Sequence, residues 1–103
     1  MSEKTVLCGA SAYSRKYFFN RDFAALPQRV QDELHILCVL FTEDVGGILT
    51  LYFSDEGKLC LETDAEETDA AYDEIGAGLK IRQMQTEKRE LFEALEMFWK
   101  VFR

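Results

Sequence analysis

Residues 45–62 constrain the fold more than any other stretch of the chain, because their alternation and their turn specify the same β-hairpin. Successive side chains of a strand point to opposite faces, so Leu51 and Phe53 share one face while Tyr52 lies on the other. The turn at 54–57 fits a type I turn followed by a left-handed residue, a conformation that Gly57 adopts without a Cβ clash. The resulting strands, at about 48–53 and 58–63, gather one apolar cluster made of Leu51, Phe53, Leu59 and Leu61.

An isolated hairpin is marginally stable in water, so the rest of the chain must supply further strands and a cover for the apolar face. The first 20 residues are ambiguous: Thr5–Cys8 favours a short strand, and residues 13–19 form either a second strand or a helical turn. We expect extended structure that adds to the hairpin sheet.

A helix is predicted over about 27–44, ahead of the hairpin. Pro27 suits a first helical turn, where its missing N–H costs nothing. Apolar residues then recur at helical intervals, and Gly46 and Gly47 end the helix. The run LHILCVLFT at 34–42 is apolar enough to be read instead as a buried strand. The proline start, the spacing and the length favour the helix.

The carboxyl-terminal third predicts a broken helix over about 69–102. Residues 63–68 read as a solvated loop, and Thr68 or Asp69 as the helix cap. Gly76 and Gly78 predict a break, since glycine costs a helix interior about 1 kcal/mol relative to alanine. The chain is therefore predicted to be a single α+β domain, 1–103, in which a small antiparallel sheet is covered on its apolar face by both helical segments.

Acidic charge is concentrated in one part of the chain. The net charge is −7 over 103 residues, and residues 43–74 hold eleven acidic residues against one lysine. Such a surface repels phosphate backbones, so no nucleic-acid partner is expected there. The candidate contacts for a basic protein partner are Asp64, Glu66, Glu67 and Asp69.

Cysteine usage and hydropathy favour a cytoplasmic protein without a membrane segment. Cys8, Cys38 and Cys60 are odd in number and widely spaced, which argues against a disulfide framework and for buried thiols. The amino terminus lacks the apolar core of a signal peptide, and no run approaches the roughly 18 apolar residues of a membrane span.

No catalytic, metal or cofactor site is predicted. His35 and Cys38 stand one helical turn apart, yet Cys8 and Cys60 are isolated, whereas structural zinc sites take their ligands in close pairs. A Cys–His nucleophile pair lacks an identifiable orienting group. The acidic run at 64–74 lacks the glycine and glutamate positions of an EF-hand, and residues 76–80 lack the spacing of a phosphate loop.

Two hypotheses for function follow. The first is a non-enzymatic protein-interaction domain that presents the acidic surface at 55–74 to a basic partner; an inhibitor or immunity-type protein fits this description. Phe92 and Trp99 add apolar surface to the last helix and are candidate contacts for a partner or a homodimer, with core packing as the alternative.

The second hypothesis is a small enzyme or small-molecule binder that uses the polar face of the sheet. Its candidate pocket consists of Tyr52, Cys60, Tyr13 and Tyr17.

The phrases CGASAY, DVGGILTLYF, YDEIGAGLK and KRELFEALEMFWK, taken together, give the chain a family resemblance. It resembles a family of short uncharacterised proteins from anaerobic Gram-positive bacteria, known only as a domain of unknown function. The resemblance implies a bacterial cytoplasmic protein. It supplies no catalytic or binding residue.

Overall fold

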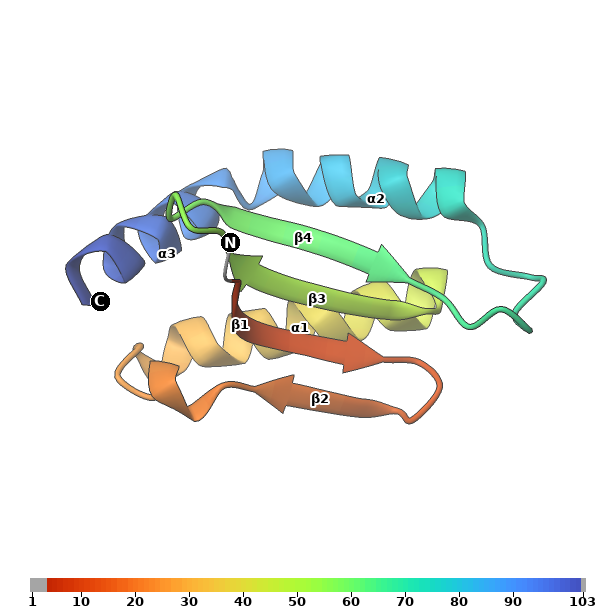
Figure 1. Ribbon diagram of the computed structural model, residues 1–103, viewed down its shortest axis with the longest axis horizontal. Helices are drawn as coiled ribbons and strands as arrows, with labels where there is room; N and C mark the ends of the chain where they lie inside the picture. The colour runs from red at the N-terminus through yellow and green to blue at the C-terminus, as the bar shows by residue number, and fades with distance from the viewer. Residues whose placement is uncertain (1–3, 103) are drawn as a thin grey trace.

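The computed structural model describes residues 4–102, in which four strands form one antiparallel sheet of order β2-β1-β3-β4. The elements follow one another as β1 (Thr5–Ser11), β2 (Lys16–Phe19), the 3-10 helix η1 (Arg21–Phe23), α1 (Gln28–Val45), β3 (Ile48–Phe53), β4 (Leu59–Asp64), α2 (Glu74–Glu87) and α3 (Arg89–Phe102). The predicted α+β class is confirmed (Figure 1). Residues 1–3, the start of the predicted amino-terminal extended stretch, lie outside the described part.

The predicted hairpin is confirmed as β3 and β4. Phe53 pairs with Leu59 and Leu51 pairs with Leu61, which is the register that the turn specifies. Gly57 has a φ of 83°, and its N–H donates to the Ser54 carbonyl at 2.9 Å. Leu49, Leu51 and Phe53 are buried, so the alternation of the strand correctly marked its core face.

The amino-terminal segment adds two strands to the hairpin sheet, as expected, and the alternative of a helical turn at 13–19 is wrong. β1 pairs with β2 on one side and with β3 on the other. A register shift between Val6 and Cys8 marks a β-bulge, and because of it the consecutive residues Leu7 and Cys8 are both buried. Simple alternation would have buried only one of them.

The run at 34–42 is helical, within α1, and the alternative of a buried strand is wrong. The run is continuously apolar because its apolar side chains lie on two faces of the helix. Leu34, Leu37 and Phe41 face the core, whereas Ile36 and Leu40 point outward and are 60% and 57% exposed. The run therefore reads as uniformly apolar because the outer face of α1 is apolar as well.

The carboxyl-terminal helix begins and breaks at positions other than those predicted. Asp73, rather than Thr68 or Asp69, caps α2, and its carboxylate accepts from the Ile75 N–H at 3.1 Å. A Cβ at Gly76 would lie 2.5 Å from Asp73 Oδ2, so this glycine makes room for the cap and does not break the helix. The break falls at Lys88, where the chain changes direction into α3 (Figure 1).

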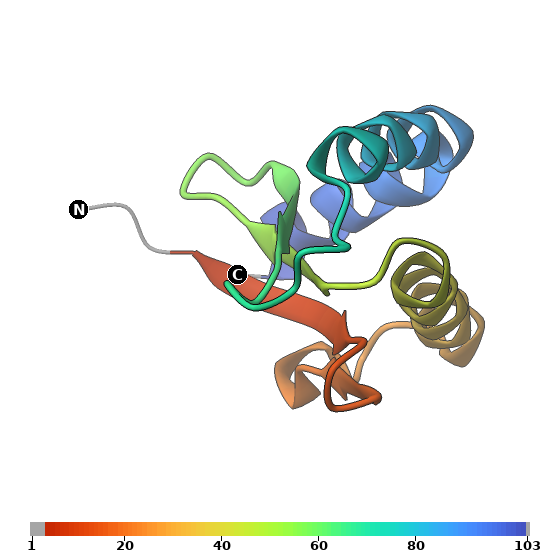
Figure 2. The ribbon, with the colours of Figure 1, turned by 90° about the vertical axis from the view of Figure 1, so that its right-hand side faces the viewer.

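The three α-helices lie on one side of the sheet, and no helix of the described part of the chain covers the opposite face, which we call the open face (Figure 2). The predicted cover of the Leu51 and Phe53 face is thus confirmed. At the end of the sheet beneath α3, Phe53 stacks on Trp99 with ring centroids 5.1 Å apart, and Phe23 of η1 contacts both rings. No helix among the described residues is long and apolar enough to cross a membrane.

Candidate functional site

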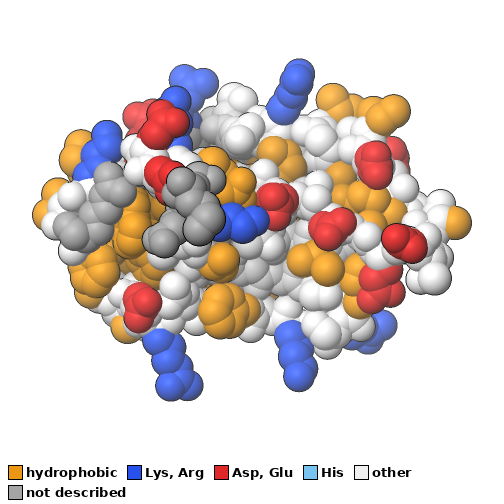
Figure 3. All heavy atoms as spheres, in the orientation of Figure 1, with side chains coloured by type: hydrophobic (Ala, Val, Ile, Leu, Met, Phe, Trp, Pro, Cys, Tyr) orange, Lys and Arg blue, Asp and Glu red, His pale blue; other side chains and the backbone are white. Residues whose placement is uncertain are grey.

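The connection between β4 and α2 is the most acidic part of the molecule. We call residues 62–74 the acidic segment; it holds seven carboxylates, and no lysine, arginine or histidine occurs between residues 59 and 79. Acidic side chains gather at the corresponding end of the open face (Figure 3). The segment lies at the same end as the turn that joins β1 to β2 (Figure 1).

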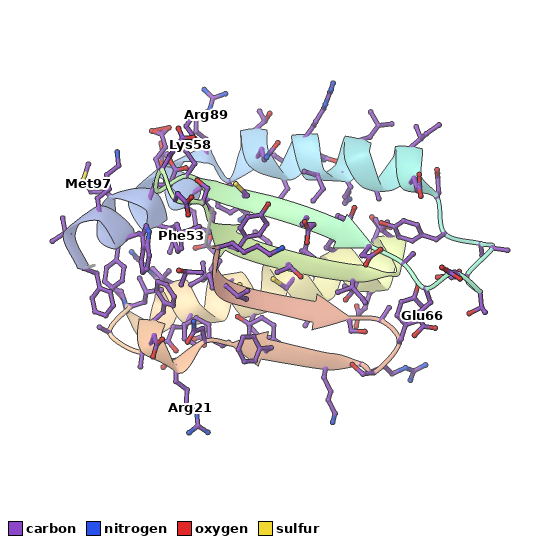
Figure 4. All side chains as sticks on the ribbon, viewed as in Figure 1. Arg21, Phe53, Lys58, Glu66, Arg89 and Met97 are labelled. Carbon is purple, nitrogen blue, oxygen red and sulfur yellow. The ribbon has the colours of Figure 1, made fainter. Side chains whose placement is uncertain are left out.

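Tyr13, in the β1–β2 turn, fixes the middle of the acidic segment. Its hydroxyl donates to Asp69 Oδ2 at 2.6 Å and accepts from the Glu66 N–H at 3.1 Å. The hydrogen bond to the Asp69 carboxylate raises the pKa of the Tyr13 hydroxyl above its usual value. Glu66 lies beside this turn (Figure 4). One hydroxyl thus links two positions of a segment that has no regular secondary structure between Asp64 and Glu74.

The far end of the segment is fixed by Tyr72, which packs against Gly47. A Cβ at Gly47 would lie 2.6 Å from Tyr72 Cε1 and 2.6 Å from the Asp64 carbonyl oxygen. Gly47 also has a φ of 71°, which side-chain-bearing residues rarely adopt. The position therefore requires glycine for both reasons. The two glycines have separate roles: Gly46 is the C-cap of α1, and Gly47 makes room for the acidic segment.

The carboxylates of the segment are largely without cationic partners. Glu62 forms an ion pair with Lys4 at 3.4 Å, and the same ammonium lies 4.7 Å from the centre of the Tyr52 ring. Among residues 4–102, no ion pair involves a carboxylate between Asp64 and Glu74. Of the four predicted partner contacts, Asp64, Glu66 and Glu67 are exposed, and Asp69 is half-buried against Tyr13.

The four residues of the predicted pocket lie in three different places. Tyr52 and Cys60 are cross-strand partners on the open face of the sheet. Tyr17 lies on the helix-covered face, where its ring stacks on His35 at 4.2 Å and burial raises the pKa of its hydroxyl. Tyr13 holds the acidic segment. The structure therefore brings Tyr52 and Cys60 together but separates both of them from Tyr13 and Tyr17.

Phe92 is buried, and Trp99 is half-buried against the core. Phe92 is only 8% exposed, and Trp99 stacks between α3 and the end of β3. The apolar side chains that α3 turns toward solvent are Met97, Val101 and Phe102. Helical periodicity could not separate these groups, because apolar residues surround the end of α3 on more than one side.

Two of the three cysteines meet in the core, a contact that nothing in their spacing indicates. Cys8 Sγ of β1 lies 3.8 Å from Cys38 Sγ of α1, and both residues are fully buried. The hydrogen bond with Cys8, together with burial, raises the pKa of the Cys38 thiol. A thiol kept protonated in this way is a poor nucleophile. No group of three metal-ligating side chains that could hold an ion occurs within residues 4–102.

A groove between α1 and α2 is the feature that sequence reasoning missed. Its floor is apolar, and ion pairs from Asp44 to Lys80, at 3.0 Å, and from Glu33 to Lys88, at 3.2 Å, join its two walls. The exposed Ile36 and Leu40 stand on its α1 wall. Their outward position depends on which side of α1 meets the sheet.

The fold and these surfaces define a small α+β protein with one open sheet face, an acidic connection and an apolar groove between helices. The chain belongs to a family of unknown function, DUF6145, whose sequence profile matches residues 4–103. No curated protein is significantly similar to it. No solved structure matches it significantly either.

Proposed function

We propose that the chain acts as a single, non-enzymatic interaction domain that binds a basic protein partner through the acidic segment. The observation that carries this proposal is the set of carboxylates between Asp64 and Glu74, which have no ion pair within residues 4–102 and are held in place by Tyr13 and Tyr72. The resemblance noted above supports a bacterial, cytoplasmic setting, and an inhibitor or immunity-type role fits the same chemistry.

Fixed carboxylates suit binding better than a flexible acidic tail does. A segment that is already ordered loses less conformational entropy when a partner binds, so more of the contact energy contributes to affinity. Concentrated charge of one sign also attracts an oppositely charged partner from a distance and speeds association. A phosphate-bearing partner would be repelled by the same field.

The rival proposal, a small-molecule site on the open face, has weaker support. Tyr52 and Cys60 do share that face, but Tyr17 lies on the opposite one and Tyr13 is engaged with Asp69. A ligand that contacted Tyr52 and Cys60 would meet a sheet surface rather than an enclosed pocket built from the four residues.

The proposal is tested with a fluorescently labelled oligolysine peptide, whose binding to the full chain is followed by anisotropy at low and at physiological ionic strength. Neutralising three carboxylates of the segment, in the triple variant D64N/E66Q/E67Q, is expected to weaken binding several-fold. The matched control is E56Q/E90Q/E93Q, which removes the same charge from exposed positions on the β3–β4 turn and α3. Although Glu56 is close to the acidic segment in the sequence, the β3–β4 turn lies at the opposite end of the sheet from that segment (Figure 1). Because exposed charges are screened by salt, the difference between the variants should shrink at the higher ionic strength.

Equal weakening by the two triple variants would contradict the proposal, because the peptide would then sense only the net charge. A wild-type chain that does not bind the peptide even at low ionic strength would also contradict it.

A further inference from the structure

The outer face of α1 has an apolar centre flanked by charges of opposite sign. Ile36 and Leu40, one helical turn apart, are 60% and 57% exposed. Arg29 lies seven residues before Ile36, and Glu43 lies seven residues after it. Seven residues are close to two full turns of an α-helix, so these charges lie on the same outer face as Ile36, about 10 Å to either side of it. Neither Arg29 nor Glu43 forms an ion pair within residues 4–102.

The outer face of α1 is complementary to a second copy of the same face that runs antiparallel to it. If two α1 helices cross antiparallel at Ile36, each Arg29 faces Glu43 of the other copy, and the two Ile36 side chains meet on the symmetry axis. Leu40 of each copy then lies beside the groove of the other. An isologous contact of this kind brings the same surface patch of both subunits together and closes at two copies.

The adjoining groove suits an apolar insertion. Its floor includes Leu37, Phe41 and Met84, all buried by α1 and α2. The ion pairs made by Glu33 and Asp44 lie eleven residues apart along α1, a span of about 16 Å. The lining continues past the Glu33 ion pair to Gln28 and Arg29, so the groove is longer than the span between the two ion pairs.

Charge also favours a second copy over a highly charged foreign helix. The walls of the groove, taken with Glu43, carry three basic residues (Arg29, Lys80 and Lys88) against five acidic ones (Asp32, Glu33, Glu43, Asp44 and Glu87), a net of −2 on a chain whose net charge is −7. The acidic segment at 62–74, by contrast, carries seven carboxylates and no basic residue. Like-charge repulsion is therefore weaker for pairing through α1 than for pairing through the acidic segment.

We infer that two copies of this chain pair through the outer face of α1, with antiparallel helices centred on Ile36 and reciprocal Arg29–Glu43 ion pairs. The inference is independent of the partner proposed for the acidic segment. It also places self-association away from Phe92, which is buried, and from Trp99, which is half-buried against Phe53.

Sedimentation velocity of the full chain over a range of concentrations, at physiological ionic strength, tests the inference. The wild-type chain is expected to show a concentration-dependent dimer. Arg29→Glu and Glu43→Arg should each reduce the dimer fraction, because each places like charges opposite one another. The double variant R29E/E43R should restore it, because the reciprocal pairs form again with their signs exchanged.

Ile36→Lys should give a monomer at every concentration, while Ile75→Lys serves as the matched control, since Ile75 is an exposed isoleucine of α2, 78% accessible. Circular dichroism should show all variants folded, because the altered side chains are exposed. A monomeric wild type would overturn the inference, as would failure of the double variant to recover or an equal effect of Ile75→Lys. A monomer that instead bound a labelled amphipathic helical peptide in the groove would identify a foreign helix as the occupant and overturn it too.

Discussion

The three cysteines have different surroundings although each lies among apolar residues in the sequence. Cys8 and Cys38 are fully buried between β1 and α1, with their sulfur atoms 3.8 Å apart. Cys60 is half-buried on the open face of the sheet, opposite Tyr52. Thiol reactivity requires both access and the thiolate form, and burial disfavours both. Cys60 should therefore react with thiol reagents, whereas Cys8 and Cys38 should not.

Thiol titration of the native chain with Ellman's reagent is expected to modify Cys60 readily and to leave Cys8 and Cys38 protected. In denaturant all three should react, because the core that encloses the pair is lost. Mass spectrometry of the peptides assigns the reactive position, and the Cys60→Ser variant is the control, with no fast reaction expected in the native state. Rapid native labelling of Cys8 or Cys38 would contradict the packing of α1 on β1.

At the scale of the element, α2 contains two glycines with different roles. The side chain of Asp73, the N-cap, occupies the space that a Cβ at Gly76 would take, with Oδ2 at 2.5 Å. At Gly78 a Cβ would meet no atom within 4 Å. Helix propensity alone predicts a break at both positions, because it assigns the same cost to every glycine. The difference arises from one neighbouring carboxylate.

Gly78→Ala should stabilise the protein by about 1 kcal/mol, the difference in helix propensity between the two residues. Gly76→Ala should gain at most little, because displacing the Asp73 carboxylate costs about 0.5–2 kcal/mol of capping energy. Urea unfolding followed by far-ultraviolet circular dichroism measures both changes. Equal stabilisation by the two substitutions would show that Asp73 caps α2 without needing the space at Gly76.

At the scale of the whole molecule, one aromatic cluster joins segments that are distant in the chain. Phe23 of η1 is fully buried and contacts Phe53 of β3 at 5.6 Å and Trp99 of α3 at 5.5 Å between ring centroids. Because one side chain of η1 packs against both β3 and α3, its removal weakens the packing of all three elements. Truncating it should weaken the entire fold rather than fray one end.

Phe23→Ala should destabilise the protein by about 3–5 kcal/mol, the usual cost of removing a buried aromatic ring. Phe23→Leu keeps more of the volume and should cost less, which provides a folded variant if the alanine variant unfolds. Phe18→Ala, at a position 57% exposed on the open face, is the matched control and should change stability by only about 0.5 kcal/mol. Chemical denaturation monitored by Trp99 fluorescence measures all three; similar losses at Phe18 and Phe23 would contradict the central position of Phe23.

Where several local signals agree, the sequence alone predicts the outcome: this holds for the β3–β4 register, for the α1 helix between Pro27 and Gly46, and for the acidity of residues 62–74. Which surfaces remain exposed depends instead on contacts between distant parts of the chain. Ile36 and Leu40 resemble core residues in the sequence, and Trp99 fits either a partner contact or core packing, because a hydrophobic pattern does not show which side of a helix meets the sheet. Tyr13 and Asp69 are 56 residues apart, and only the folded chain brings them together. Local periodicity therefore predicted the elements, while long-range contacts created the candidate surfaces.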